Sequence, residues 1–96
     1  SLYKSFLSYT YMTRKRWELI SYVSSSSYRV QILKALTEPS TPTQLARKLK
    51  LDRPNVSRVL IDLTQKELAK CLNPNSIRTR FYERTKEGEE ILKYLK

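Results

Sequence analysis

The chain has 96 residues, of which 40% are hydrophobic, so it can form one compact core but not two domains of ordinary size. Nineteen Lys and Arg against nine Asp and Glu give a formal charge of +10, which favours a polyanionic partner: nucleic acid first, an anionic membrane surface second. Cys71 is the only cysteine and histidine is absent, so we expect no disulfide within the chain, no metal, no cofactor and an intracellular, cytoplasmic location.

The N-terminal segment differs in composition from the rest of the chain. Its first eleven residues are rich in Ser and Tyr, and the composition changes at Met12. We therefore expect residues 1–12 to form an N-terminal arm or extension, and residues 13–96 to form a single domain. No run of apolar residues approaches the roughly 18 to 20 that span a bilayer, so no membrane partner is expected.

Apolar residues at helical spacing predict the first two helices. The first helix is expected over about residues 14–24 and the second over about residues 28–37. The serine run at 24–27 separates them and can supply an N-cap to the second. Pro39 prevents the second helix from continuing.

Two further helix starts follow within a few residues of each other. Thr41 is expected to be an N-cap, with Pro42 at the first helical position and Gln44 placed to complete a capping box. Asp52 is expected to cap the next helix, over about residues 53–66. Two short helices joined by a short turn form a helix-turn-helix.

The last part of the chain changes to short extended runs. Strands are expected over residues 69–72 and 79–84, separated by turn-forming residues at 73–76. Thr85 then caps a final helix. The predicted fold class is therefore mainly α with a small β-hairpin.

This order of elements resembles the winged-helix repressors of the ArsR and MarR kinds. The resemblance covers about residues 26–95, and it is carried by the stretch 26–68 and by Tyr-Glu-Arg-Thr-Lys-Glu-Gly at 82–88. Within 26–68 the similar runs are Ser-Tyr-Arg-Val-Gln-Ile-Leu-Lys-Ala-Leu and Pro-Asn-Val-Ser-Arg-Val-Leu-Ile-Asp-Leu. The resemblance implies a winged helix-turn-helix and a dimeric DNA-binding transcriptional regulator. The helix over about 53–66 would be the recognition helix, and the hairpin over about 69–84 would be the wing.

The chain departs from that family pattern at several positions. Lys50 and Glu67 stand where the family usually has glycine, and a side chain at positive φ costs about 1 kcal/mol, so either these sites are mildly strained or the turns differ from those of the family. Arg84 stands where the family has an inward-pointing leucine, which leaves the register of the second strand open. Residues 46–48 are Ala-Arg-Lys, where metal-sensing members carry paired cysteines, so a thiolate metal sensor is excluded there.

The helix over about 53–66 carries the residues expected to contact DNA. A helical projection turns its polar side and Ile61 away from the core. Arg58 can pair with a guanine and Asn55 with an adenine, while Arg53 and Ser57 suit phosphate oxygens. The alternative is a solvated face, with Arg53 in a salt bridge.

Arg78 and Arg80 are two residues apart on the hairpin, so in an extended strand they project from one face and can follow a phosphate strand or enter a minor groove. The alternative is a charged edge that prevents aggregation. Gln44 is expected to be a cap, with a phosphate contact as its second role. The predicted DNA-binding residues are Gln44, Arg53, Pro54, Asn55, Ser57, Arg58, Arg78 and Arg80.

The remaining expectations concern activity, assembly and the single cysteine. The chain has no histidine, no glycine-rich phosphate loop and no carboxylate cluster, so we expect a regulator binding specific double-stranded DNA sequences, with no catalytic residue, rather than an enzyme. A homodimer is expected through apolar residues of the terminal helices: Trp17, Leu19, Ile20, Tyr22, Ile91, Leu92, Tyr94 and Leu95. The alternative function is a winged-helix protein-interaction module in a larger transcription or RNA-handling assembly. Cys71 is expected to be a small buried core residue, with redox sensing as the alternative.

Overall fold

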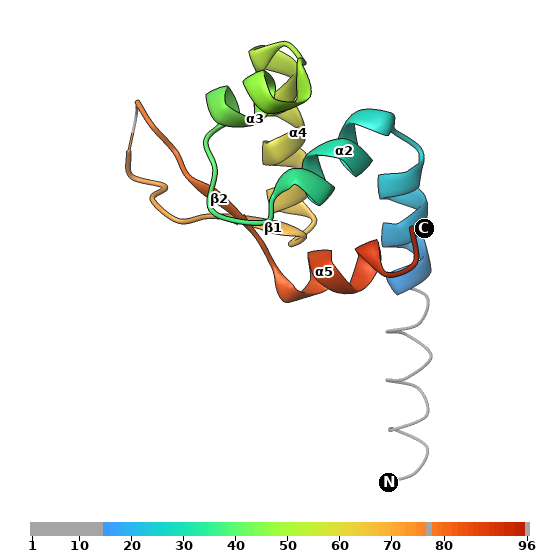
Figure 1. The fold of residues 1–96 in the computed structure, drawn as a ribbon. Coiled ribbons are helices and arrows are strands. Elements are labelled where there is room, and N and C mark those ends of the chain that lie inside the picture. Colours follow the sequence, from blue (N-terminus) through green and yellow to red (C-terminus); the bar gives the residue numbers. More distant parts are fainter. Residues whose placement is uncertain (1–14, 77, 96) are drawn as a thin grey trace, which may run out of the picture.

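The computed structural model describes residues 15–76 and 78–95. The predicted arm over 1–12 and residue 14 of the first predicted helix lie outside the described residues. The described chain consists of a helical segment over 15–24, α2 Ser27–Ala35, α3 Pro42–Leu49, α4 Arg53–Gln65, β1 Ala69–Cys71, β2 Tyr82–Arg84 and α5 Lys86–Leu92 (Figure 1). The predicted fold class, mainly α with a small β-hairpin in a winged helix-turn-helix, is confirmed.

Side-chain caps fix where four of the helices begin. Ser26, Thr41, Asp52 and Thr85 each accept a hydrogen bond from the backbone N–H three residues further on. At α3 the two bonds form a capping box, because the Gln44 side chain also accepts from the backbone N–H of Thr41 at 3.0 Å. Each cap stabilises its helix by about 1 kcal/mol. The N-caps predicted at Thr41, Asp52 and Thr85 are confirmed.

The helix α2 begins one residue earlier than predicted and ends two residues sooner. Its C-cap, Leu36, leaves the helical region with ψ of 57°, and its N–H bonds to the Leu33 carbonyl at 3.4 Å. Pro39 therefore does not mark the end of the helix itself, because the chain has already turned three residues before it.

The two positions that lack the family glycine both adopt left-handed backbone. Lys50 has φ of 57° and Glu67 has φ of 63°. After each of them the next N–H bonds back across the helix end, from Leu51 to Ala46 at 3.0 Å and from Leu68 to Leu63 at 2.9 Å. These bonds satisfy carbonyls at the helix C-termini and offset the cost of the strained backbone. Of the two alternatives, mild strain or different turns, the left-handed backbone of Lys50 and Glu67 favours mild strain at both sites.

The strands pair in antiparallel fashion, and a third segment joins them. The register pairs Ala69 with Arg84 and Cys71 with Tyr82. On the other edge of β2, Tyr82 exchanges backbone hydrogen bonds of 3.0 and 2.8 Å with Ser40, just before α3. The base of the hairpin is therefore attached directly to the start of the helix-turn-helix.

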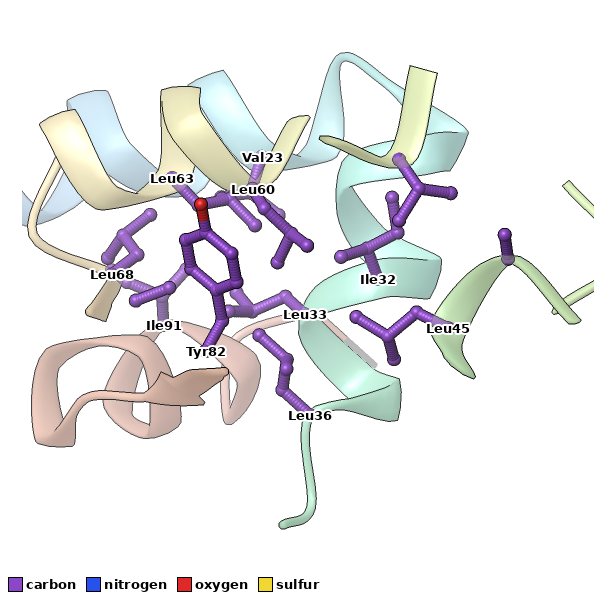
Figure 2. Packing of buried hydrophobic residues seen from close by; sticks show 13 residues of the cluster. Val23, Ile32, Leu33, Leu36, Leu45, Leu60, Leu63, Leu68, Tyr82 and Ile91 are labelled. Atoms are coloured by element: carbon purple, nitrogen blue, oxygen red, sulfur yellow. The ribbon is translucent and has the colours of Figure 1, made fainter. Parts of the chain in front are cut away.

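One core joins all the helices to the hairpin. Tyr82 points from β2 toward Leu63, Leu68 and Ile91, and Leu33 lies beside its ring (Figure 2). The largest fully buried side chains are Val23, Ile32, Leu33, Leu45, Val56, Leu60, Leu63 and Leu68. The expectation that Cys71 is a buried core residue was wrong: it is only half-buried, because it ends β1 where the hairpin leaves the body.

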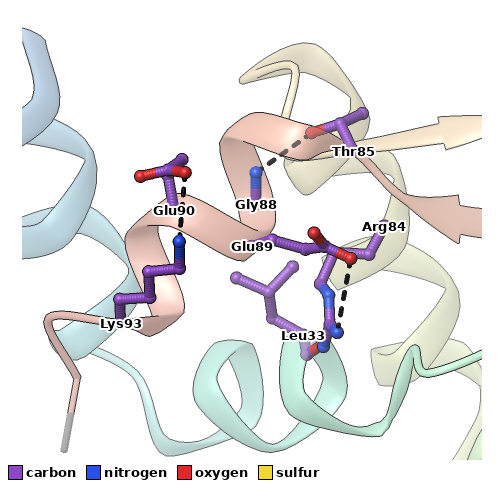
Figure 3. A network of polar contacts seen from close by, with 7 residues as sticks. All are labelled: Leu33, Arg84, Thr85, Gly88, Glu89, Glu90 and Lys93. Carbon is purple, nitrogen blue, oxygen red and sulfur yellow. Dashed lines mark hydrogen bonds and ion pairs between the residues drawn. The ribbon is translucent and has the colours of Figure 1, made fainter.

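Arg84 joins the base of the hairpin to two helices (Figure 3). Its Nη1 donates to the Leu33 carbonyl at 3.0 Å, and its Nη2 lies 3.8 Å from a Glu89 carboxylate oxygen. The side chain is only 18% exposed, so it points inward, as the family leucine does. The guanidinium contacts the last turn of α2 through the Leu33 carbonyl, at the end of the helix where the dipole favours a cation.

Candidate nucleic-acid interface

The exposed N-terminal end of α4 carries most of the predicted contact residues. Arg53, Pro54 and Arg58 are exposed, whereas Asn55 and Ser57 are half-buried. Val56 and Leu60 are fully buried on the opposite side of the helix. The core therefore fixes the rotation of α4 about its axis, and it does so in the orientation that the helical projection predicts.

The N-cap of α4 also orients Asn55. The Asn55 side-chain amide donates to one Asp52 carboxylate oxygen at 2.8 Å, and its backbone N–H donates to the other at 3.2 Å. The hydrogen bond from the Asn55 side chain is the main cause that lowers the pKa of Asp52 below its ordinary value. Asn55 is thus held beside the cap, with one amide N–H already used. The carboxamide oxygen and the second N–H of Asn55 make no hydrogen bond among the described residues.

Cations gather around the turn between α3 and α4. The exposed basic residues there are Arg47, Lys48, Lys50, Arg53 and Arg58. The salt bridges of the described residues lie elsewhere, at Lys70–Glu83, Arg84–Glu89 and Lys93–Glu90. The salt bridge considered for Arg53 is therefore not formed. The contact prediction omitted Arg47, Lys48 and Lys50, although the excess positive charge over residues 25–50 was the signal that marked them.

The hairpin projects from the helical body on the side away from the helix over 15–24 (Figure 1). Arg78 and Arg80 are both exposed on it. The expectation that residues 79–84 form one strand was wrong, because β2 begins at Tyr82. The alternation that would put both arginines on one face therefore does not apply.

Asn73 explains why the second strand is short. Its side chain accepts from the Phe81 N–H at 2.7 Å and donates to the Thr79 carbonyl at 2.7 Å, which replaces pairing between backbones with side-chain bonds. Arg80 folds back, with its Nε donating to the Ser76 carbonyl at 2.9 Å. Part of the Arg80 guanidinium is therefore already engaged within the hairpin.

The terminal helical segments meet on the far side of the molecule from the hairpin. Trp17 is 66% exposed and Tyr94 is 55% exposed, and the Arg16 guanidinium lies 3.5 Å from the Tyr94 hydroxyl. Ile91, by contrast, is buried in the core. An open groove of about 580 Å³ runs beside this face and is lined by Lys15, Arg16, Leu19, Lys66, Glu67, Lys86, Glu87, Glu90 and Ile91.

Tyr22, another residue predicted at the dimer contact, is used within the chain. The Arg29 guanidinium stacks over its ring at 3.9 Å from the centroid, and Lys66 approaches the ring at 5.2 Å. Burial raises the pKa of the Tyr22 hydroxyl, against the opposing charge of Arg29. These cation–π contacts join the helix over 15–24 to α2 and to the end of α4.

Neither a membrane span nor a metal cluster is found in the part of the chain that the structure describes. No helix there has the length and apolar character needed to cross a bilayer. Within residues 15–76 and 78–95, no group of three or more His, Cys, Asp or Glu side chains is placed to hold a metal ion.

The fold is similar to that of solved transcription regulators. A MarR family transcription regulator shares 23% identity over 96% of this chain and 70% of its own, with a TM-score of 0.62. The S. aureus MepR–DNA complex shares 19% over 99% of this chain and 80% of its own, with a TM-score of 0.65. NadR in complex with 4-hydroxyphenylacetate shares 23% identity over 99% of this chain and 70% of its own, with a TM-score of 0.66.

No protein-family model and no curated protein matches the sequence. The likeness to solved structures therefore concerns the fold. At that level the resemblance to the MarR kind is confirmed, whereas the resemblance to the ArsR kind stays a prediction.

Proposed function

We propose that this protein binds specific sequences of double-stranded DNA and regulates transcription, with α4 in the major groove and the hairpin on the flanking backbone or minor groove. The observation that carries the proposal is the exposed N-terminal end of α4, where Arg53 and Arg58 have no salt-bridge partner among the described residues. The known MepR–DNA complex, which has the same fold, supports it.

The residues of α4 divide into reading and positioning groups. In this proposal Arg58 pairs with a guanine, and Asn55, which is hydrogen-bonded to Asp52, pairs with an adenine. Pro54 at the first turn can pack on a base edge or sugar. Arg53 and Ser57 flank them and suit phosphate oxygens, which fix the position of the helix without reading sequence.

The proposed contacts with the DNA backbone extend to both sides of α4. The cations of the turn, Arg47, Lys48 and Lys50, suit one strand, and Arg78 and Arg80 on the hairpin suit a flanking segment. Gln44 lies at the start of α3, where its side chain caps the helix. A phosphate contact is the second role we propose for it, because helix N-termini favour anions.

The affinity for duplex DNA is expected to depend strongly on salt, because the formal charge is +10. With about six phosphates neutralised, affinity falls about a thousandfold between 50 and 200 mM salt. Fluorescence anisotropy of a labelled duplex over that range measures the slope. Replacing Arg47, Lys48 and Lys50 with glutamine should make the slope of log affinity against log salt concentration shallower by about 3. The same change at the distant Lys93 should leave that slope unaltered. A flat salt dependence of the unmodified protein would contradict the proposal.

We also propose that two copies associate through the exposed face of the terminal helical segments, which carries Trp17 and Tyr94. Both are large exposed aromatic side chains on segments that meet through the Arg16–Tyr94 contact, and a second copy that covers them would bury their apolar area. Such a dimer would place two copies of α4 on successive turns of the duplex, with half-sites about 34 to 36 Å apart.

Sedimentation equilibrium at tens of micromolar is expected to give a dimer. Trp17→Glu should shift the protein to monomer, because it places a charge in the proposed contact. Phe81→Glu is the matched control: Phe81 is also an exposed aromatic residue, but it lies on the hairpin. A monomeric unmodified protein would refute the dimer while leaving binding to a single half-site open to measurement.

A further inference from the structure

Ile61 is an apolar side chain on the outward face of α4. It is 46% exposed, whereas Val56, Leu60 and Leu63 of the same helix are fully buried. Ile61 follows Arg58 by three residues and Ser57 by four, which places it next to both on the helix surface. It therefore lies on the face that the proposed function turns toward the groove.

The fold does not explain the presence of isoleucine at this position. The buried face of α4 is formed by Val56, Leu60 and Leu63, and a β-branched residue on an exposed helix surface is a weaker helix former than Lys, Glu or Arg. Single exposed hydrophobic residues are common on protein surfaces. This one is distinguished by its place, one turn beyond the arginine proposed to read a base.

The major groove offers one apolar group that such a side chain can contact, the C5 methyl of thymine. Three residues of helix advance about 4.5 Å, and successive base pairs rise about 3.4 Å, so Ile61 and Arg58 reach positions about one or two base pairs apart.

Resting on the proposed function, we infer that Ile61 reads the methyl group of a thymine one or two base pairs from the base bound by Arg58. The side chain adds sequence preference without a hydrogen bond, since cytosine presents no methyl group at the same place and uracil differs from thymine in that methyl alone. Ile61 is thus a specificity-determining residue beyond the polar contacts of α4.

The test replaces each thymine of a preferred duplex by deoxyuridine, one at a time, and measures the Kd of the full chain. At one position per half-site, one or two base pairs from the base bound by Arg58, the unmodified protein should bind the uracil duplex about fourfold more weakly, the factor that corresponds to burying one methyl group. Ile61→Ala should bind the thymine and uracil duplexes equally at those positions.

Leu72→Ala provides the matched control, because Leu72 is 45% exposed and lies on the hairpin. This variant should keep the preference of the unmodified protein for thymine. Equal binding of thymine and uracil at every position by the unmodified protein, or an unaltered preference in Ile61→Ala, overturns the inference while the proposed function stands. Failure to bind any duplex overturns both.

Discussion

Replacing Arg58 with alanine is expected to weaken binding to the preferred duplex by about 1 to 3 kcal/mol and to relax discrimination at one base position. The reason is geometric: Arg58 is exposed on the side of α4 opposite the buried Val56 and Leu60, where it can pair with a guanine edge. A lost base contact removes sequence information together with affinity. Binding to scrambled duplexes should suffer less, and titrations with preferred and scrambled duplexes measure both.

The hairpin variant is the comparison that gives the Arg58 result its meaning. Replacing Arg78 and Arg80 together with alanine should weaken all sequences nearly alike and make the salt slope shallower by up to about 2 per subunit. Because Arg80 already donates to the Ser76 carbonyl, it should contribute less than Arg78 to this change in the salt slope. If the hairpin variant changes base preference while Arg58→Ala lowers every affinity equally, the hairpin is the reading element and the assignment to α4 is wrong.

The second large effect is on stability and comes from Gly88, the only glycine of the chain. A Cβ at this position would overlap the Leu68 carbonyl oxygen and lie 2.9 Å from the Arg84 Cγ. The carbonyl cannot move freely, because it accepts the Thr85 N–H at 3.1 Å. Gly88→Ala should therefore lower the free energy of unfolding by about 3 kcal/mol, the upper end for overpacking a core.

Urea denaturation followed by circular dichroism measures that loss. Glu87→Ala is the control, since Glu87 is the exposed neighbour of Gly88 in α5 and its side chain has room. It should change the unfolding midpoint only slightly. An unaltered unfolding midpoint in Gly88→Ala would mean that α5 leaves room for a methyl group beside the Leu68 carbonyl, which contradicts the close contact between them.

The elements that the sequence predicts well are those fixed by local chemistry. The caps at Thr41, Asp52 and Thr85 act within three residues, so their hydrogen bonds can be read directly from the spacing. The rotation of α4 follows equally from the spacing of its apolar residues. Positive φ at Lys50 and Glu67 was one of two alternatives that the sequence left open, because a left-handed residue is common just past a helix C-terminus but usually is glycine.

The features that escaped prediction depend on contacts between distant residues. Arg84 bonds to a carbonyl 51 residues earlier in the chain, and no local pattern indicates that partner. The length of the second strand depends on Asn73, which binds the backbone of Thr79 and Phe81 across the hairpin loop. A turn-forming residue was expected there. Its side chain, however, also binds the backbone six and eight positions later, and that contact across the loop could not be read from the local pattern.

Selection of bound sites from a pool of random duplex DNA is the most direct test of the central claim, that α4 reads sequence in a major groove. The account predicts enrichment of a motif that contains a guanine for Arg58 and is repeated with two-fold symmetry about one helical turn apart. The same selection with Arg58→Ala should lose that guanine preference first. Recovery of a pool with no enriched sequence would contradict the account and would favour the winged-helix protein-interaction module instead.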